Sequence, residues 1–105
     1  MEFVSHSFQT FLNEAPEHAK AWLEAVGKLD QASSLDQKTE EIAYLAVMAT
    51  VGLESGIPFH VKSAKASGVT RKEIISAILL GLPAVGNQVV KVLPIALAAF
   101  DEESS

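Results

Sequence analysis

Apolar residues recur with helical spacing along most of the chain, and no stretch alternates apolar and polar residues for long enough to be a strand. We therefore expect an all-α fold of about six helices. The central helix is the uncharged run from Ile42 to Leu53, which is too short to cross a bilayer, because a membrane span takes about 20 residues. The apolar residues of this run face every side of a helix, so the helix must be covered on every side.

The N-terminal third predicts two further helices. Residues 3–13 have the spacing of a short amphipathic helix, and Pro16 begins a second helix, since a proline in the first turn costs little. The second helix is expected to bury a stripe of five residues: Ala19, Trp22, Leu23, Val26 and Leu29. A connection over residues 31–36 follows, in which either Ser34 or Asp36 caps the central helix.

Glycine, serine and proline mark the next boundaries. Gly52 ends the central helix, because it tolerates a positive φ. Ser55 is expected to cap a fourth helix that has Pro58 in its first turn and runs to Ser67. The inward face of this helix is expected to consist of Ile57, His60, Val61 and Ala64.

Two helices complete the predicted chain. Thr70 and Glu73 fit a capping box, in which each side chain accepts a hydrogen bond from the other residue's backbone N–H. The fifth helix begins there and ends around residues 81–83. The last helix spans about residues 87–100, and Pro94 should kink it, because proline lacks the N–H that a helix interior needs.

Composition narrows the possible functions. The 105 residues, 49% of them hydrophobic, fit a single domain over 1–105 that leaves apolar surface exposed unless it finds partners. The 8 basic and 13 acidic residues give a net charge of −5, which excludes binding to a nucleic-acid backbone. The sequence contains no cysteine, so disulfides, thiol catalysis and thiolate metal sites are excluded.

The stretch 74–100 has the hydropathy of a possible membrane span, because Lys91 is its only charged residue. Glycine, proline and polar residues divide this stretch into two pieces that are each too short for a span. We expect buried helices of an oligomer and no membrane contact. The N-terminus lacks a basic start followed by an apolar run, so a cytoplasmic protein is expected.

Candidate chemistry lies at the two ends of the central helix. Glu41 is in its first turn and His60 follows the break at its end, and together they would form an acid/base pair, since histidine titrates near neutral pH. Glu54, in the break itself, is a second candidate carboxylate. Tyr44 and Trp22 are candidate substrate contacts. No metal and no organic cofactor is expected.

The same residues also fit a purely structural interpretation. His60 would then be a core histidine with satisfied nitrogens, Glu41 and Glu54 would complement helix dipoles, and Trp22 would belong to the core. Helical rise adds an objection to direct pairing: in antiparallel helices, Glu41 lies about 15 Å from the turn and His60 lies much nearer to it. Direct contact would need a steep crossing, a bridging water or another subunit.

The chain from Leu35 onward resembles the carboxymuconolactone decarboxylase family of the alkyl hydroperoxidase D-like superfamily. The resemblance is carried by the LDxKTxE run that ends at Glu41, by His60 nineteen residues later, by the AxxxGVTxxEI segment from Ala64 and by GLPA from Gly81. It implies the all-helical fold of that superfamily and a homohexamer built as a trimer of dimers.

The resemblance points to two branches of the superfamily that catalyse different reactions. Peroxidase relatives carry Cys-x-x-Cys seven and four residues before the histidine, where this sequence has Leu53 and Gly56. A family-wide label of peroxiredoxin activity would therefore come from relatives that have the cysteines, since no thiolate is present here. The decarboxylase branch also lacks the cysteines. It implies a cofactor-free lyase reaction on a small acidic lactone, with His60 as acid/base and Glu41 as its support. Arg71 is the only arginine, so the paired arginines that would hold two substrate carboxylates are missing.

Two hypotheses of different classes follow. The chain is either a cofactor-free small-molecule enzyme of the decarboxylase type, which uses His60 and Glu41, or a non-catalytic helical oligomer that has lost the site. An imidazole that is buried against apolar side chains, with both nitrogens satisfied by the backbone and no cavity beside it, would favour the oligomer.

Overall fold

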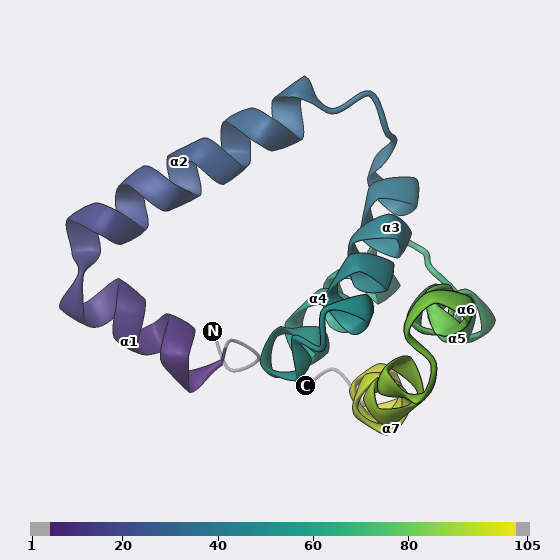
Figure 1. Cartoon of the computed structure of the whole chain (residues 1–105). Coiled ribbons are helices and arrows are strands. Elements are labelled where there is room, and N and C mark those ends of the chain that lie inside the picture. The colour runs from purple at the N-terminus through teal and green to yellow at the C-terminus, as the bar shows by residue number, and fades with distance from the viewer. Residues whose placement is uncertain (1–4, 103–105) are drawn as a thin grey trace. The chain divides into compact units, whose positions relative to one another are not determined.

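A computed structural model of the chain describes residues 5–102. All regular structure in this range is helical, which confirms the all-α prediction. The chain consists of two compact units, Met1–Asp36 and Gln37–Ser105 (Figure 1), and each is described by itself. The prediction that residues 1–105 form a single domain stays a prediction.

The first unit contains α1 (His6–Glu14) and α2 (Pro16–Ala32). The backbone N–H of Phe8 donates to Ser5 Oγ at 3.2 Å, so Ser5 caps α1, and Pro16 begins α2 as predicted. Phe3 and Val4, which the sequence assigned to the first helix, lie outside the described residues.

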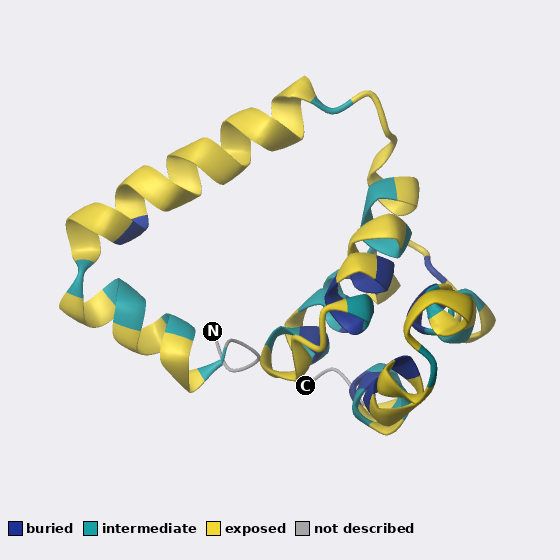
Figure 2. Cartoon of the chain, viewed as in Figure 1, coloured by how far each residue is buried: buried dark blue, intermediate teal, exposed yellow. Residues whose placement is uncertain are grey.

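Within the first unit, the predicted buried stripe of α2 is wrong, except for Ala19. The other four residues of the stripe are exposed, namely Trp22, Leu23, Val26 and Leu29. Within this unit α2 packs only against α1, which has 9 residues against the 17 of α2. The shorter helix covers too little of the longer one, and Figure 2 shows α2 as almost wholly exposed.

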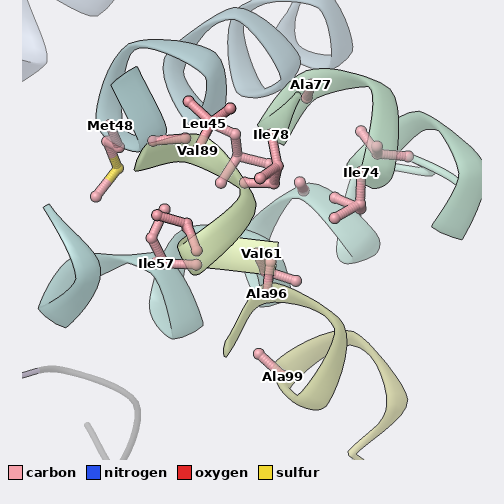
Figure 3. Packing of buried hydrophobic residues seen from close by; sticks show 14 residues of the cluster. Leu45, Met48, Ile57, Val61, Ile74, Ala77, Ile78, Val89, Ala96 and Ala99 are labelled. Carbon is pink, nitrogen blue, oxygen red and sulfur yellow. The ribbon is translucent and has the colours of Figure 1, made fainter. Parts of the chain in front are cut away.

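The second unit contains α3 (Gln37–Thr50), the 3-10 helix η1 (Glu54–Gly56), α4 (Ile57–Ala66), α5 (Arg71–Ile78), α6 (Leu82–Val85) and α7 (Asn87–Asp101). Both α3 and α7 pack against α4 and α5. The core lies among these four helices (Figure 3), and its largest fully buried side chains are Leu45, Ile57, Val61, Ile74, Ile78, Val89 and Val92.

Within the second unit, the central helix α3 is covered on one side only. Leu45, Met48 and Ala49 are buried in the core, whereas Val47 and Val51 are exposed. The expectation that α3 is covered on every side is therefore not met by the other helices of this unit, because α4, α5 and α7 all pack on the side that carries Leu45.

Most of the predicted boundaries are confirmed, but two are wrong: the cap at Ser55, and the end of the fifth helix, which was expected around residues 81–83 and is at Ile78. Gly52 adopts φ +74° after α3, and Pro58 lies in the first turn of α4. Ser55 does not cap α4, because residues 54–56 form η1 and the position before α4 is taken by Gly56, which has no side chain to accept a hydrogen bond. Of the two proposed caps of α3, Asp36 directly precedes its first residue.

The capping box of α5 is confirmed in both halves. The Glu73 N–H donates to Thr70 Oγ1 at 3.1 Å, and the Thr70 N–H donates to Glu73 Oε1 at 2.9 Å. The short helix α6 was not predicted; it fills the gap between α5 and α7. Pro94 lies inside α7 as expected. Within residues 5–102, every helix is too short or too polar to span a bilayer.

Candidate functional site

Helices α3 and α4 pack against each other and bring together most of the predicted site residues. Glu41 and Tyr44 are three residues apart on α3, and His60 and Ser63 are three residues apart on α4. Side chains with this spacing lie on the same face of a helix. The two pairs therefore form one cluster at the contact between the helices.

Glu41 is fixed by a hydrogen bond across this contact. The Ser63 hydroxyl donates to Glu41 Oε1 at 2.9 Å, and the pair is partly buried. Sequence reasoning missed Ser63. The available signal was its spacing, because a residue three positions after an inward-facing histidine shares the histidine's helix face.

His60 is half-buried between two aromatic rings. The Tyr44 ring lies 4.8 Å from the imidazole between centroids at 62°, and the Phe59 ring lies at 5.2 Å and 83°. Within residues 5–102, neither imidazole nitrogen has a hydrogen-bond partner on the protein. The structural interpretation, in which the backbone satisfies both nitrogens, is therefore not supported.

Two opposing influences act on the charge of His60. Burial lowers the pKa of His60 below its usual 6.5, because the buried imidazolium loses hydration, while the nearby negative charge of Glu41 acts in the opposite direction. The net direction is downward, so the neutral imidazole dominates near neutral pH. A neutral imidazole with free nitrogens is able to accept a proton, and its conjugate acid is a stronger acid than a free histidine.

Direct pairing of Glu41 with His60 is not seen among the described residues. The carboxylate is bonded to Ser63 and influences His60 only through its charge. The objection from helical rise is thus partly upheld: α3 and α4 place Glu41 beside residue 63, one helical turn beyond His60. Its role is electrostatic in this arrangement.

The two remaining predicted residues lie outside this cluster. Glu54 is exposed in η1, and within residues 5–102 its carboxylate has no hydrogen bond or ion pair with Glu41, Tyr44 or His60. Trp22 belongs to the other unit, on α2, where it is 56% exposed. Neither residue gains support as part of the site.

Arg71, the only arginine in the sequence, is already paired. Its Nε and Nη2 atoms donate to the two carboxylate oxygens of Asp101, each at 2.9 Å. The Arg71 hydrogen bond lowers the pKa of the Asp101 carboxyl, so the pair stays charged on both sides. This guanidinium ties α5 to the end of α7.

Two other features of the described residues bear on ligands. No three histidine, aspartate or glutamate side chains within residues 5–102 gather in a way that would hold a metal ion. An open groove of about 460 Å³ lies on the first unit between α1 and α2, with Leu12, Pro16, Ala19, Lys20, Leu23 and Glu24 as its lining. The groove contains none of the predicted site residues.

Comparison with known proteins gives one match. The model of the carboxymuconolactone decarboxylase family matches residues 16–98, which include α2 and all of the α3–α4 cluster. No curated protein and no solved structure matches the chain.

Proposed function

The chain belongs to the carboxymuconolactone decarboxylase family, and we propose that it is a cofactor-free lyase that removes carbon dioxide from a small acidic substrate. The observation that carries this proposal is the state of His60. The imidazole is half-buried, has no hydrogen-bond partner on the described protein and lies within the field of Glu41. These are the properties of a group that donates and accepts protons rather than of one that holds the fold together.

The proposed reaction needs one proton and no redox partner. The bond between the substrate carbon and its carboxylate breaks, carbon dioxide leaves, and the electron pair stays on the carbon, where a conjugated carbonyl spreads its charge. The imidazolium of His60 then donates its proton to that carbon, and the imidazole takes up a new proton from solvent. Glu41 stabilises the imidazolium, and Tyr44, an exposed residue whose ring packs against the imidazole, would contact the substrate.

The charges of the chain favour a substrate with few anionic groups. Arg71 is occupied by Asp101, so it does not offer a free guanidinium to a second carboxylate. Loss of carbon dioxide is favoured when the leaving carboxylate is not itself held by a cation, since a bound cation would stabilise the starting state. We therefore propose a substrate whose leaving carboxylate is its main charge.

A thiol peroxidase activity is not part of this proposal. The sequence has no cysteine, and the two positions that carry cysteines in peroxidase relatives are Leu53 and Gly56. Without a thiolate there is no group for a peroxide to oxidise by that mechanism.

The test is carbon dioxide release from γ-carboxymuconolactone and from a panel of small unsaturated mono-acids. We expect His60→Ala to lower the rate by about 10²–10⁴-fold, the usual share of a general acid/base. His18→Ala is the matched control, because His18 is exposed on α2, and it should retain the full rate. Activity that survives His60→Ala would contradict the assigned role.

A non-catalytic oligomer is the second candidate function, and the exposed apolar side chains of α2 and α3 favour it. We propose self-association in either case, as a homohexamer built from three dimers. If no acid in the panel is turned over while the protein sediments as an oligomer, the non-catalytic function replaces the enzyme.

A further inference from the structure

The bond between Ser63 and Glu41 is a cross-helix contact that the proposed reaction does not itself use. It joins α4 to α3, is partly buried, and has a donor–acceptor distance of 2.9 Å. Ser63 is on the same face of α4 as His60, one turn further along. Glu41 has no other hydrogen bond within the described residues, so this serine alone fixes where its carboxylate lies.

We propose that the Ser63 hydroxyl is a positioning group that holds the Glu41 carboxylate one helical turn from His60, and so keeps the imidazole under a fixed negative charge. Ser63 does not touch the reacting atoms. The part of this inference that concerns turnover rests on the proposed function, whereas the part that concerns the charge on His60 does not.

The physical argument starts from the freedom of a glutamate side chain. Three rotatable bonds let a partly buried carboxylate turn outward, where water solvates it better. A hydroxyl donor on the facing helix offsets that tendency, because a hydrogen bond to an ionised group is stronger than one between neutral groups. Without the hydroxyl, the carboxylate should move toward water and its field at the imidazole should weaken.

Other ionisable groups near His60 do not provide a substitute. Tyr44 on α3 contacts the imidazole through its ring. Among the described residues, Glu54 in η1, and Lys91 and Asp101 on α7, which also packs against α4, form no hydrogen bond or ion pair with His60. Glu41 is the charged group that acts on the imidazole.

The test is an NMR titration of the His60 ring protons in the full chain. We expect Glu41→Gln to shift the midpoint to lower pH, and Ser63→Ala to shift it in the same direction by a smaller amount. In a Glu41→Gln background, Ser63→Ala should have no further effect, because its influence passes through the carboxylate.

A matched pair of variants isolates the hydroxyl from the packing. Ser63→Thr keeps the hydroxyl and should retain the wild-type midpoint, while Ser63→Val has the same shape without the donor and should behave as Ser63→Ala. If Ser63→Ala and Ser63→Val leave the midpoint unchanged, or shift it equally in the Glu41→Gln background, the positioning role is overturned.

The same variants separate this inference from the proposed function. If a substrate is found, Ser63→Ala should lower kcat with little change in KM and should move the pH profile in the direction of the NMR midpoint. If no substrate is found, the decarboxylase proposal fails and the NMR result still decides the role of Ser63.

Discussion

At the scale of single residues, two effects of opposite sign act on the pKa of His60. Burial lowers the pKa of His60, and the charge of Glu41 limits that effect. The rings of Tyr44 and Phe59 pack edge-on against the imidazole but offer it no hydrogen bond. The result is a histidine that is dry enough to be a good proton donor and open enough to meet a ligand.

The depressed pKa of His60 predicts a dependence of stability on pH. In the unfolded chain the histidine binds a proton near its usual 6.5, whereas in the folded chain it does so only at lower pH. Between these two values the unfolded state holds more protons, so the free energy of unfolding falls as the pH decreases through this window and is regained above 6.5. Urea unfolding of wild type and His60→Gln at a series of pH values measures this contribution.

The variant should show a shallower slope through the acidic window than wild type. His18→Gln, which removes an exposed histidine on α2, is the control and should keep the wild-type slope. Equal slopes in wild type and His60→Gln would mean that burial does not disfavour the charged imidazole.

The sequence predicted part of this cluster and missed the rest for a definable reason. Helical spacing on a single element correctly predicted that His60 faces the same way as buried residues of α4, and the family motifs singled out Glu41. The partner of Glu41 depends on how α3 and α4 cross, and one sequence without its tertiary contacts does not contain that angle. Ser63 was therefore missed, and Glu54 and Trp22 were included without support from the structure.

At the scale of helices, local chemistry fixed the boundaries where side chains act on their own backbone. The capping box of α5 is the clearest case, because both hydrogen bonds lie within four consecutive residues. The predicted cap at Ser55 failed, because residues 54–56 are wound into η1 and Gly56 precedes α4. The four-residue helix α6 was missed, since it is too short to show any periodicity.

The capping box predicts a measurable loss of stability. Thr70→Ala removes the acceptor for the Glu73 N–H and should lower the free energy of unfolding by about 1 kcal/mol. Thr70→Ser keeps the hydroxyl and should stay close to wild type. Chemical denaturation of the two variants shows whether the missing hydroxyl causes the loss of stability. Equal losses in both variants would contradict the role of Thr70 as a cap.

Gly81 predicts a steric effect inside the GLPA segment. A Cβ at this position would overlap the Oγ1 atom of Thr50 at the end of α3, while the Cβ and Cγ2 atoms of Thr50 would lie at 3.4 and 3.5 Å, in ordinary van der Waals contact. Gly81→Ala should therefore destabilise the fold by about 1–3 kcal/mol, a typical cost of overpacking. The glycine of this segment thus has a structural reason, because the side chain of Thr50 leaves no room for a Cβ.

A second substitution tests that explanation directly. Thr50→Ala removes the overlapping hydroxyl, so the double variant should recover much of the stability that Gly81→Ala loses. Thermal unfolding of the two single variants and the double variant measures the coupling. Strictly additive losses would show that the overlap with Thr50 is not the cause.

At the scale of the whole molecule, the two units differ in how much core they contain. The second unit gathers a continuous cluster from four helices, whereas in residues 5–36 the fully buried apolar residue is Ala19. The sequence shows apolar residues at helical spacing on α2 and on all sides of α3, and several of them are exposed. It did not show what covers them, because a stripe that faces a second chain has the same spacing as one that faces the chain's own core.

The exposed stripe predicts that the protein self-associates. Wild type should sediment with a mass above the 11.2 kDa of one chain, and Leu29→Glu should lower that mass, since Leu29 is 69% exposed in the single chain. Gln31→Glu adds the same charge at an exposed polar position of α2 and should leave the mass unchanged. A wild-type protein that sediments as one chain at all concentrations would contradict the prediction.

Trp22 gives the chain a built-in optical reporter, because it is the only tryptophan in the sequence and more than half of its surface is open to water. Its fluorescence comes from one point on α2 alone. Cover by a second copy would shift the emission to shorter wavelengths and protect the indole from acrylamide quenching, and dilution would reverse both changes. Assembly could thus be followed in unlabelled protein, at concentrations far below those that sedimentation requires.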